Sequence, residues 1–256
     1  MNATPAEIPK TTGKLLVGTA GWAVLSAVAN LFPAEGSQLQ RYAARFPAAE
    51  INSSFHRPHR RTTYERWAAS VPPDFRLSVK LPKAISHAVS IDGQEALVAR
   101  FAEEAHGLGD KLGVLLVQFP PKRLFVAADM DVLFATLAAS FPCPIACEPR
   151  HASWFEEAAD AFLSRHRVAR VAADPARVPG ADAPGGWDGL RYYRLHGSPV
   201  IYRSSYDEPA LDKLGETLAG ATAAGADAWC IFDNTASSAA TDNALALLDR
   251  TTVDQR

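Results

Sequence analysis

The chain has 256 residues, 48% of them apolar, and a formal net charge of −2. Its length suits a single domain of about 250 residues, and its nearly neutral charge gives no overall preference for an acidic or a basic partner. No apolar stretch approaches the roughly 20 residues of a membrane-spanning helix, so no membrane partner is expected.

The first residues and the cysteines predict a cytoplasmic location. Met1–Lys14 is polar and lacks the apolar core of a signal peptide. Cys143, Cys147 and Cys230 lie within or beside apolar runs and lack the spacing of a zinc site. Reduced thiols in a core are therefore the expected state, which fits a reducing compartment.

Eight short apolar runs are predicted to be buried parallel strands, since they are rich in Val, Ile, Leu and aromatic residues. In chain order they are Leu15–Thr19, Ala48–Asn52, Phe75–Lys80, Val114–Gln118, Ile145–Glu148, Val168–Asp174, Tyr192–His196 and Trp229–Asn234. Segments with helical periodicity separate most of them, at about 38–46, 62–71, 94–108, 129–139, 153–166, 209–224 and 239–250. This order predicts one (β/α)8 TIM-type barrel over residues 15–256, after a polar segment at 1–14.

One connection departs from this alternation. Pro175–Gly189, between the sixth and seventh strands, is rich in Pro, Gly and Asp, so a loop is predicted in place of the helix. An open, doubly wound sheet is the alternative architecture, and it needs a switch in strand order that the sequence does not exclude.

Polar side chains end seven of the predicted strands, and a barrel gathers such ends at one face. They are Asn52, Lys80, Gln118, Glu148, Asp174, His196 and Asn234. Residues two apart share a side of a strand, which places Glu50 with Asn52 and Arg194 with His196. Further cations lie at or after strand ends and predict a positive mouth: Arg57, Arg60, Arg61, Lys83, Lys122, Arg123, Arg150 and Arg203.

Seven short motifs occur at these strand ends. They are Gly18-Thr19-Ala20-Gly21-Trp22, Glu50-Ile51-Asn52-Ser53-Ser54-Phe55, Phe75-Arg76-Leu77-Ser78-Val79-Lys80, Leu116-Val117-Gln118-Phe119-Pro120-Pro121, Glu148-Pro149-Arg150-His151-Ala152-Ser153-Trp154-Phe155, Arg194-Leu195-His196-Gly197 and Phe232-Asp233-Asn234-Thr235. In this order they resemble the YecE-like family, a domain of unknown function numbered seventy-two, from about Val17 to Asp249. The family is similar in fold to phosphodiesterase-type barrels, including endonuclease IV and xylose isomerase relatives. The resemblance implies a barrel here and leaves the activity open.

Four residues at the strand ends are candidate catalytic groups. Glu148 and Glu50 are the acid/base candidates, with His196 assisting and Asp174 beside them. The alternative is that the glutamates form structural ion pairs, for instance Glu148 with Arg150 or Arg194. The same four residues have ligand types that suit zinc or manganese, but only one histidine ends a strand, so a metal is not favoured and the cofactor stays unknown.

The candidate binding residues fall into three groups. Lys80, Arg150 and Arg194 are cations that would hold an anion or stabilise developing negative charge, and Lys80 has a further role to consider, a Schiff base. Asn52, Gln118 and Asn234 would orient the substrate. The aromatic residues Trp22, Phe55, Trp154, Tyr202 and Tyr206 would stack on a sugar or base, or else cover the end of the barrel.

Three hypotheses about function follow from these residues. The first is a hydrolase that acts on a phosphorylated or nucleic-acid substrate. The second is a non-catalytic module that binds a phosphate-bearing small molecule, the favoured partner, or nucleic acid. The third, which is weaker, is a glycoside hydrolase that uses Glu50 and Glu148 as its two carboxylates.

Overall fold

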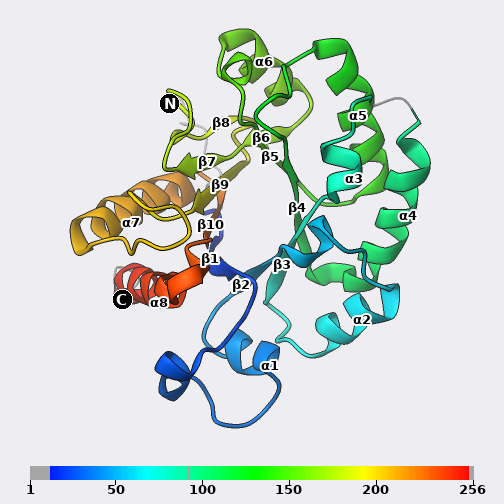
Figure 1. Cartoon of the computed structure of the whole chain (residues 1–256). Coiled ribbons are helices and arrows are strands. Elements are labelled where there is room, and N and C mark those ends of the chain that lie inside the picture. The colour runs from blue at the N-terminus through cyan, green and yellow to red at the C-terminus, as the bar shows by residue number, and fades with distance from the viewer. Residues whose placement is uncertain (1–11, 91–92, 254–256) are drawn as a thin grey trace, which may run out of the picture.

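The strands form a ring that the helices surround, in an α/β barrel (Figure 1). The computed structural model describes residues 12–90 and 93–253, so most of the polar segment expected at 1–14 lies outside the described residues. Within the described part of the chain, no helix is both long and apolar enough to cross a membrane.

Ten strands make up one sheet, in the order β7-β9-β10-β1-β2-β3-β4-β5-β6-β8. The expected α/β barrel is confirmed. The strict count of eight strands is not reproduced, because the expected sixth strand divides at Val171 and a two-residue strand pairs antiparallel with it. The strands are β1 (Leu15–Ala20), β2 (Ala48–Ile51), β3 (Arg76–Lys80), β4 (Leu112–Gln118), β5 (Ile145–Glu148), β6 (Val168–Arg170), β7 (Ala172–Asp174), β8 (Gly185–Gly186), β9 (Leu190–Leu195) and β10 (Asp227–Phe232).

Residues 168–174 close most of the ring because they connect the strand on one side, β5, with the strand on the other, β9. β6 pairs in parallel with β5, and β7, which follows after one residue, pairs in parallel with β9. β6 also contacts β9 directly. The sheet is therefore a nearly closed barrel rather than the open alternative.

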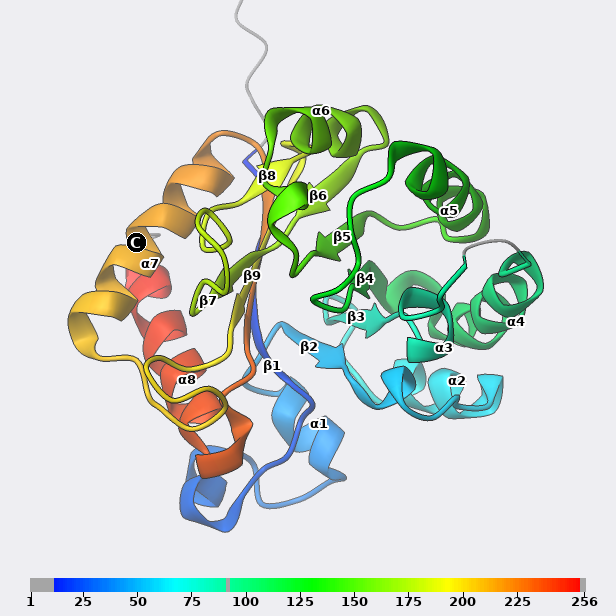
Figure 2. The same cartoon turned by 45° about the horizontal axis from the view of Figure 1, so that its top comes forward.

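The helices lie outside the ring, as Figure 2 also shows. They are α1 (Gln38–Ala43), α2 (Arg61–Ala69), α3 (Lys83–Ser86), α4 (Glu95–Ala105), α5 (Ala127–Ser140), α6 (Glu157–Arg165), α7 (Glu208–Ala223) and α8 (Ala239–Val253). Between β7 and β9, residues 175–189 are all described and contain β8 and turns but no helix. The loop expected at this connection is present.

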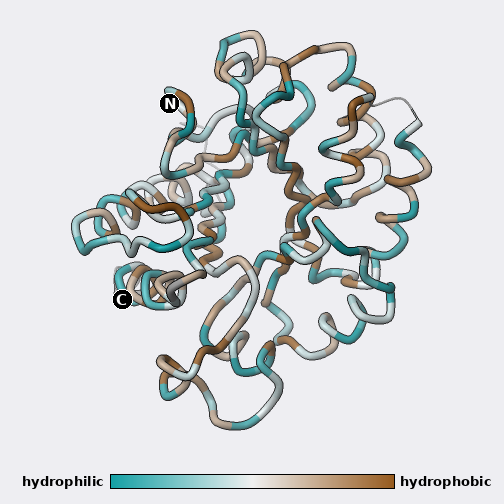
Figure 3. The backbone as a smooth tube through the Cα atoms, viewed as in Figure 1, coloured by the Kyte–Doolittle hydropathy of each residue, from teal (hydrophilic) through white to brown (hydrophobic). Residues whose placement is uncertain are grey.

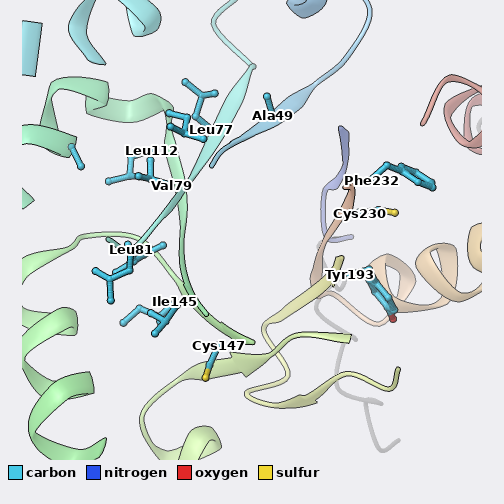
Figure 4. Close-up of a cluster of buried hydrophobic side chains, with 14 of the residues drawn as sticks. Ala49, Leu77, Val79, Leu81, Leu112, Ile145, Cys147, Tyr193, Cys230 and Phe232 are labelled. Carbon is cyan, nitrogen blue, oxygen red and sulfur yellow. The ribbon is translucent and has the colours of Figure 1, made fainter. Parts of the chain in front are cut away.

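Alternate residues of a strand face either the helices or the inside of the barrel. In Figure 4, Leu77 and Val79 of β3 point away from the ring, and both are fully buried. Ser78 and Lys80 between and after them consequently face inward. The helices alternate hydrophobic and hydrophilic residues along their length (Figure 3), as expected when one side of each packs against the strands.

The N-terminal half of the barrel interior is apolar. The rings of Tyr192 and Trp229 stack there with their centroids 5.9 Å apart, among buried side chains that include Leu16 and Val114. A Cβ atom on Gly113 would lie 2.5 Å from the Trp229 indole. Glycine at this position therefore leaves the space that the indole needs, and packed rings close this end of the barrel.

The three cysteines are free thiols. Cys147 and Cys230 are buried, and Cys143 is half-buried. Burial raises the pKa of Cys143 to about 12 and that of the other two thiols well above the ordinary value. Protonated thiols of this kind are poor nucleophiles, so they belong to the packing of the core.

Candidate functional site

Arg194 of β9 lies at the centre of the C-terminal half of the barrel interior and is fully buried. Its guanidinium donates to Glu50 on β2, from Nε at 3.0 Å and from Nη2 at 2.7 Å. It also donates from Nη1 to Glu148 on β5 at 2.5 Å and from Nη2 to Asp233 after β10 at 3.0 Å. One arginine therefore joins three carboxylates from different sides of the ring, and burial of these charges is tolerated because they are paired and hydrogen-bonded.

Glu148 is held from several directions and is 1% exposed. Besides Arg194, its Oε1 atom accepts from Gln118 Nε2 at 2.8 Å and from Arg150 Nε and Nη2 at 3.1 and 3.0 Å. Both ion pairs considered for Glu148 from the sequence, with Arg150 and with Arg194, are present.

His196 lies between two carboxylates at the top of this network. Its Nδ1 is 3.0 Å from Asp233 Oδ2, and its Nε2 is 3.6 Å from Glu148 Oε1. Burial opposes protonation of the ring, but the hydrogen bonds with Asp233 and Glu148 outweigh that effect and raise the pKa of His196. The imidazolium is thus the stable form over a wider pH range than in an exposed histidine.

The carboxylates have the opposite shift. Burial would raise the pKa of Glu148, yet Arg194 and His196 hold it well below its ordinary value of 4.5. The same two residues lower the pKa of Asp233 against the effect of burial. Glu148 therefore stays ionised at neutral pH, which leaves His196 as the candidate proton donor of this set.

Lys80, the last residue of β3, differs from the other cations of the site. It is 8% exposed, and no acceptor for its ammonium lies within hydrogen-bonding distance among the described residues. The ring of Phe55 lies against the ammonium, with its centroid 4.4 Å from Nζ. Burial and the charge of Arg194 lower the pKa of Lys80 to about 8, although three carboxylates partly oppose them.

A cavity of about 370 Å³ lies beside this corner. Its lining includes Phe55, Lys83 and His87, so the ring that touches Lys80 is also a wall of the cavity. Burial lowers the pKa of His87 to about 4, with further contributions from Lys83, Arg150, Lys80 and Arg123. Four positively charged side chains are therefore close enough to His87 to disfavour its protonation.

A second cavity, of about 740 Å³, adjoins the first and shares Lys83 and His87 with it. Lys122 and Arg123, from the segment after β4, line its far side. Lys83, Lys122, Arg123 and Arg150 thus follow β3, β4 and β5, whereas Arg203 is exposed in the loop after β9. Arg57 and Arg60 are exposed in the loop before α2, and Arg61 pairs with Glu65 on the surface.

Most residues predicted from strand ends do converge. Glu50, Lys80, Gln118, Glu148, Arg150, Arg194 and His196 belong to one connected region of the barrel interior. Asn52 follows β2 at the level of Lys80, since Ile51 pairs with Val79, and its Oδ1 atom is buried without a hydrogen-bond partner among the described residues.

Asp174 and Asn234 are not brought into this region. Asp174 of β7 accepts from the Tyr206 hydroxyl at 2.6 Å and lines a cavity of about 240 Å³ between the strands and α7. Val171 packs inside the barrel. Asp174 comes three residues later, on the opposite face of the strand, so its carboxylate faces outward. Asn234 donates to the Ser204 carbonyl and to Asn243, and it therefore anchors the loop after β9.

The five aromatic candidates have different environments. Trp154 is fully buried, stacks on Phe119 at 5.0 Å and cannot reach a ligand at the mouth. Trp22 is half-buried and packs edge-on against Trp67 at 5.0 Å. The cavity beside Lys80 is lined by Phe55.

The two tyrosines flank the loop after β9. Tyr202 is 41% exposed and lies edge-on to His196, with ring centroids 5.8 Å apart. Tyr206 is half-buried, and its hydroxyl accepts from the Gly197 amide at 2.9 Å. Tyr202 is therefore positioned to contact a ligand above His196, whereas Tyr206 holds the loop.

Sequence reasoning missed three members of the network. Asp233 binds both Arg194 and His196, and the Tyr192 hydroxyl lies 2.9 Å from Glu50 and 2.7 Å from Ser78. One signal in the sequence could have identified Asp233. Trp229, Ile231 and Asp233 are two residues apart and so share the inner face of the strand, whereas Asn234 does not. In the sequence Tyr192 has the pattern of an ordinary core residue. Its ring packs on Trp229 in the apolar half of the barrel, and only its hydroxyl reaches Glu50 and Ser78.

The metal hypothesis finds no assembled ligand set in the described residues, where no three His, Cys, Asp or Glu side chains converge as a metal site requires. Glu50 and Glu148 are each bonded to Arg194, and Asp174 lies on the other side of the strand wall.

The sequence matches the family model described as "Protein of unknown function DUF72" over residues 16–256. The chain belongs to this family. The resemblance to the YecE-like family is thereby confirmed, since the two names denote the same family. The region that carries the seven strand-end motifs lies within the match.

Solved structures of the family share this fold. A DUF72 family protein from Enterococcus faecalis V583 superposes with a TM-score of 0.78 at 20% identity, covering 93% of this chain and 95% of that one. One from Thermotoga maritima MSB8 gives a TM-score of 0.75 at 22% identity, covering 93% and 99%. At these identities the similarity establishes the barrel and not the activity.

A curated relative is the UPF0759 protein YunF of Bacillus subtilis (strain 168), which is 24% identical over 147 residues. The aligned part is 55% of this chain and 52% of the relative, so this chain spans about half the length of that protein.

Proposed function

We propose that the protein binds a small molecule with a phosphate or carboxylate group at the C-terminal mouth of its barrel, and that His196 transfers a proton during its conversion. The observation that carries the proposal is Lys80, a nearly buried ammonium without an anionic partner next to three carboxylates that are already paired. A bound anion would supply the missing partner, and charge-assisted bonds of this kind are strong in a buried site.

The size of the adjoining cavity favours a small ligand over nucleic acid. Its volume of about 370 Å³ falls at the lower end of the roughly 300–1,000 Å³ typical of small-molecule sites. Nucleic acid is bound along exposed rows of cations that follow its backbone, whereas Lys80 is nearly buried inside the barrel. The cations around His87 would draw the anion inward.

The proposed reaction is hydrolysis of a phosphate ester. Water would attack the phosphorus as its bond to the ester oxygen breaks. Lys80 and the partly exposed Arg150 would stabilise negative charge on the phosphoryl oxygens, and the His196 imidazolium would protonate the leaving oxygen. The two-carboxylate glycosidase hypothesis gains no support, because Glu50 is fully buried with both oxygens bonded to Arg194 and Glu148 is held ionised.

Calorimetric titration with inorganic phosphate tests the binding step. We expect the wild-type protein to bind phosphate, and Lys80→Met to weaken binding roughly tenfold or more, because a hydrogen bond to a charged group contributes about 1.5–3 kcal/mol. Lys213→Met is the matched control, since it removes the same charge from an exposed position on α7, beside the outer cavity. Equal losses in both variants, or no binding by the wild type, would refute the proposal.

Turnover separates an enzyme from a binding module. His196→Asn should retain phosphate binding while slowing hydrolysis of p-nitrophenyl phosphate by roughly a hundredfold, the usual contribution of a positioned general acid. If phosphate binds at Lys80 but generic phosphate monoesters and diesters are not hydrolysed, the site belongs to the non-catalytic alternative.

A further inference from the structure

We infer that Lys80 is also a nucleophile, whose amine condenses with the carbonyl carbon of a small aldehyde or ketone that carries a carboxylate or phosphate group. The inference rests on the proposed anion site and specifies the class of its substrate. It starts from a difference between the two most buried lysines of the described chain.

Lys80 and Lys111 are each 8% exposed, but only one of them is hydrogen-bonded. Lys111 Nζ donates to the carbonyl oxygens of Pro72 and Pro73 at 3.0 and 2.6 Å, and these bonds hold its side chain against the chain before β3. Among the described residues, Lys80 Nζ has no hydrogen-bond acceptor, and the Phe55 ring centroid lies 4.4 Å away. A lysine without hydrogen-bond acceptors loses little when it gives up its proton, so the surroundings of Lys80 tolerate the neutral amine.

The electrostatic field of the barrel acts in the same direction. Arg194 is permanently charged and fixed in place by Glu50, Glu148 and Asp233. Together with burial, it lowers the pKa of Lys80 to about 8. Near this pH about half of Lys80 would carry a free electron pair, against less than about 1% of an ordinary lysine with a pKa near 10.4.

The residues around Lys80 provide what each step requires. The Nζ electron pair forms a bond to the carbonyl carbon, and one proton passes from Nζ to the carbonyl oxygen to give a neutral carbinolamine. The C–O bond then breaks as His196 donates a proton to the departing hydroxyl, so that one water leaves and the nitrogen becomes a positively charged iminium. Asn52 Oδ1, buried without a partner at the same level of the neighbouring strand, is an acceptor for the carbinolamine hydroxyl.

The same surroundings define the substrate. When Lys80 is a neutral nucleophile, Arg150 remains as a partly exposed guanidinium to hold the anionic group of the substrate, with 17% of its side chain accessible. The cavity of about 370 Å³ beside Phe55 admits only a small molecule. A 2-oxo acid or a phosphorylated aldehyde combines the required carbonyl and anion within a few bonds.

Reductive trapping tests the inference on the intact protein. The protein is incubated with pyruvate as the probe, sodium borohydride is added, and peptide mass spectrometry locates the reduced adduct. We expect modification of Lys80 at least tenfold above that of Lys83, an exposed lysine at the same mouth, with yield rising from pH 6 to pH 8 as the amine loses its proton. Lactate, which lacks the carbonyl, and acetone, which lacks the anion, are the control probes.

Each outcome supports or overturns the inference. Selective modification of Lys80 by pyruvate but not by acetone supports both the nucleophile and the anionic substrate class, even if inorganic phosphate does not bind. Equal modification of Lys80 and Lys83 overturns it, as does equal yield with acetone. Phosphate binding that depends on Lys80 without any trapping leaves the proposed function standing and overturns the nucleophile. Lys80→Arg, which has no nucleophilic amine, should abolish trapping.

Discussion

Two cations lie a short way apart inside the barrel, Arg194 and Lys80, and their surroundings differ. Arg194 is surrounded by Glu50, Glu148 and Asp233 and is fully buried. Lys80 is nearly as buried, but it contacts one aromatic ring and no carboxylate. A buried charge whose partners are all supplied by the protein belongs to the fold, whereas a nearly buried charge that lacks a partner is a candidate binding group.

Removal of the paired cation should have the largest effect. Arg194→Met leaves three buried carboxylates facing one another, and the expected loss is about 3–5 kcal/mol of unfolding free energy, or failure to fold. Urea denaturation measures it. Arg191→Met on the same strand breaks only the exposed pair with Asp188 and should cost less than about 1 kcal/mol. A similar small loss for Arg194→Met would mean that the network is not structural.

The paired network should also make the protein sensitive to acid. The pKa values of Glu148 and Asp233 are lowered in the folded state, so their stabilisation is complete above their unfolded values near 4.5 and 3.8 and is lost as the pH falls below them. Each group should contribute a slope of about 1.4 kcal/mol per pH unit in that range. Asp233→Asn should remove one group's share of the slope, and an unchanged slope in urea titrations would contradict its pairing.

A smaller difference in stability is expected between substitutions of the two buried lysines, Lys111 and Lys80. Lys111→Met removes two charge-assisted hydrogen bonds, to the carbonyls of Pro72 and Pro73, which should cost about 1–3 kcal/mol. The two carbonyls keep Phe75 N–H and Arg76 Nη1 as donors. Lys80→Met should leave stability unchanged or raise it, because it removes an unpaired buried charge and keeps the contact with Phe55. A loss for Lys80→Met as large as that for Lys111→Met would assign Lys80 to the scaffold.

The smallest effect is expected for the carboxylate that faces outward. Asp174→Asn keeps an acceptor for the Tyr206 hydroxyl and should change stability by less than about 1 kcal/mol, with no change in phosphate affinity. Calorimetry on this variant provides the reference for Lys80→Met. Loss of phosphate binding would place Asp174 within the site despite its position on the outer face.

Strand patterns predicted much of the site because parallel strands bring their C-terminal ends to one face. Lys80, Glu148 and His196 were each found as the last polar residue of an apolar run. Asp174 ended such a run too, yet its side chain points outward, since alternation decides the face and a one-residue shift reverses it. Trp154 was chosen for its place after β5, but packing against Phe119 makes it part of the core.

By itself, the order of apolar runs and helical segments determined an α/β fold of mainly parallel strands with helices around them, because strands buried on both faces need helices to cover them. That the strands close into a ring and not an open sheet was decided by the pairing of residues 168–174 on both sides. The sequence also identified which chemical groups collect at the mouth. The partner of each charge was decided only by the tertiary structure: Arg194 was one of three similar cations in the sequence, and distances set by opposite strands gave it three carboxylates while leaving Lys80 none. Pairing of charges across the ring depends on register and side-chain reach between distant segments, which local sequence patterns do not contain.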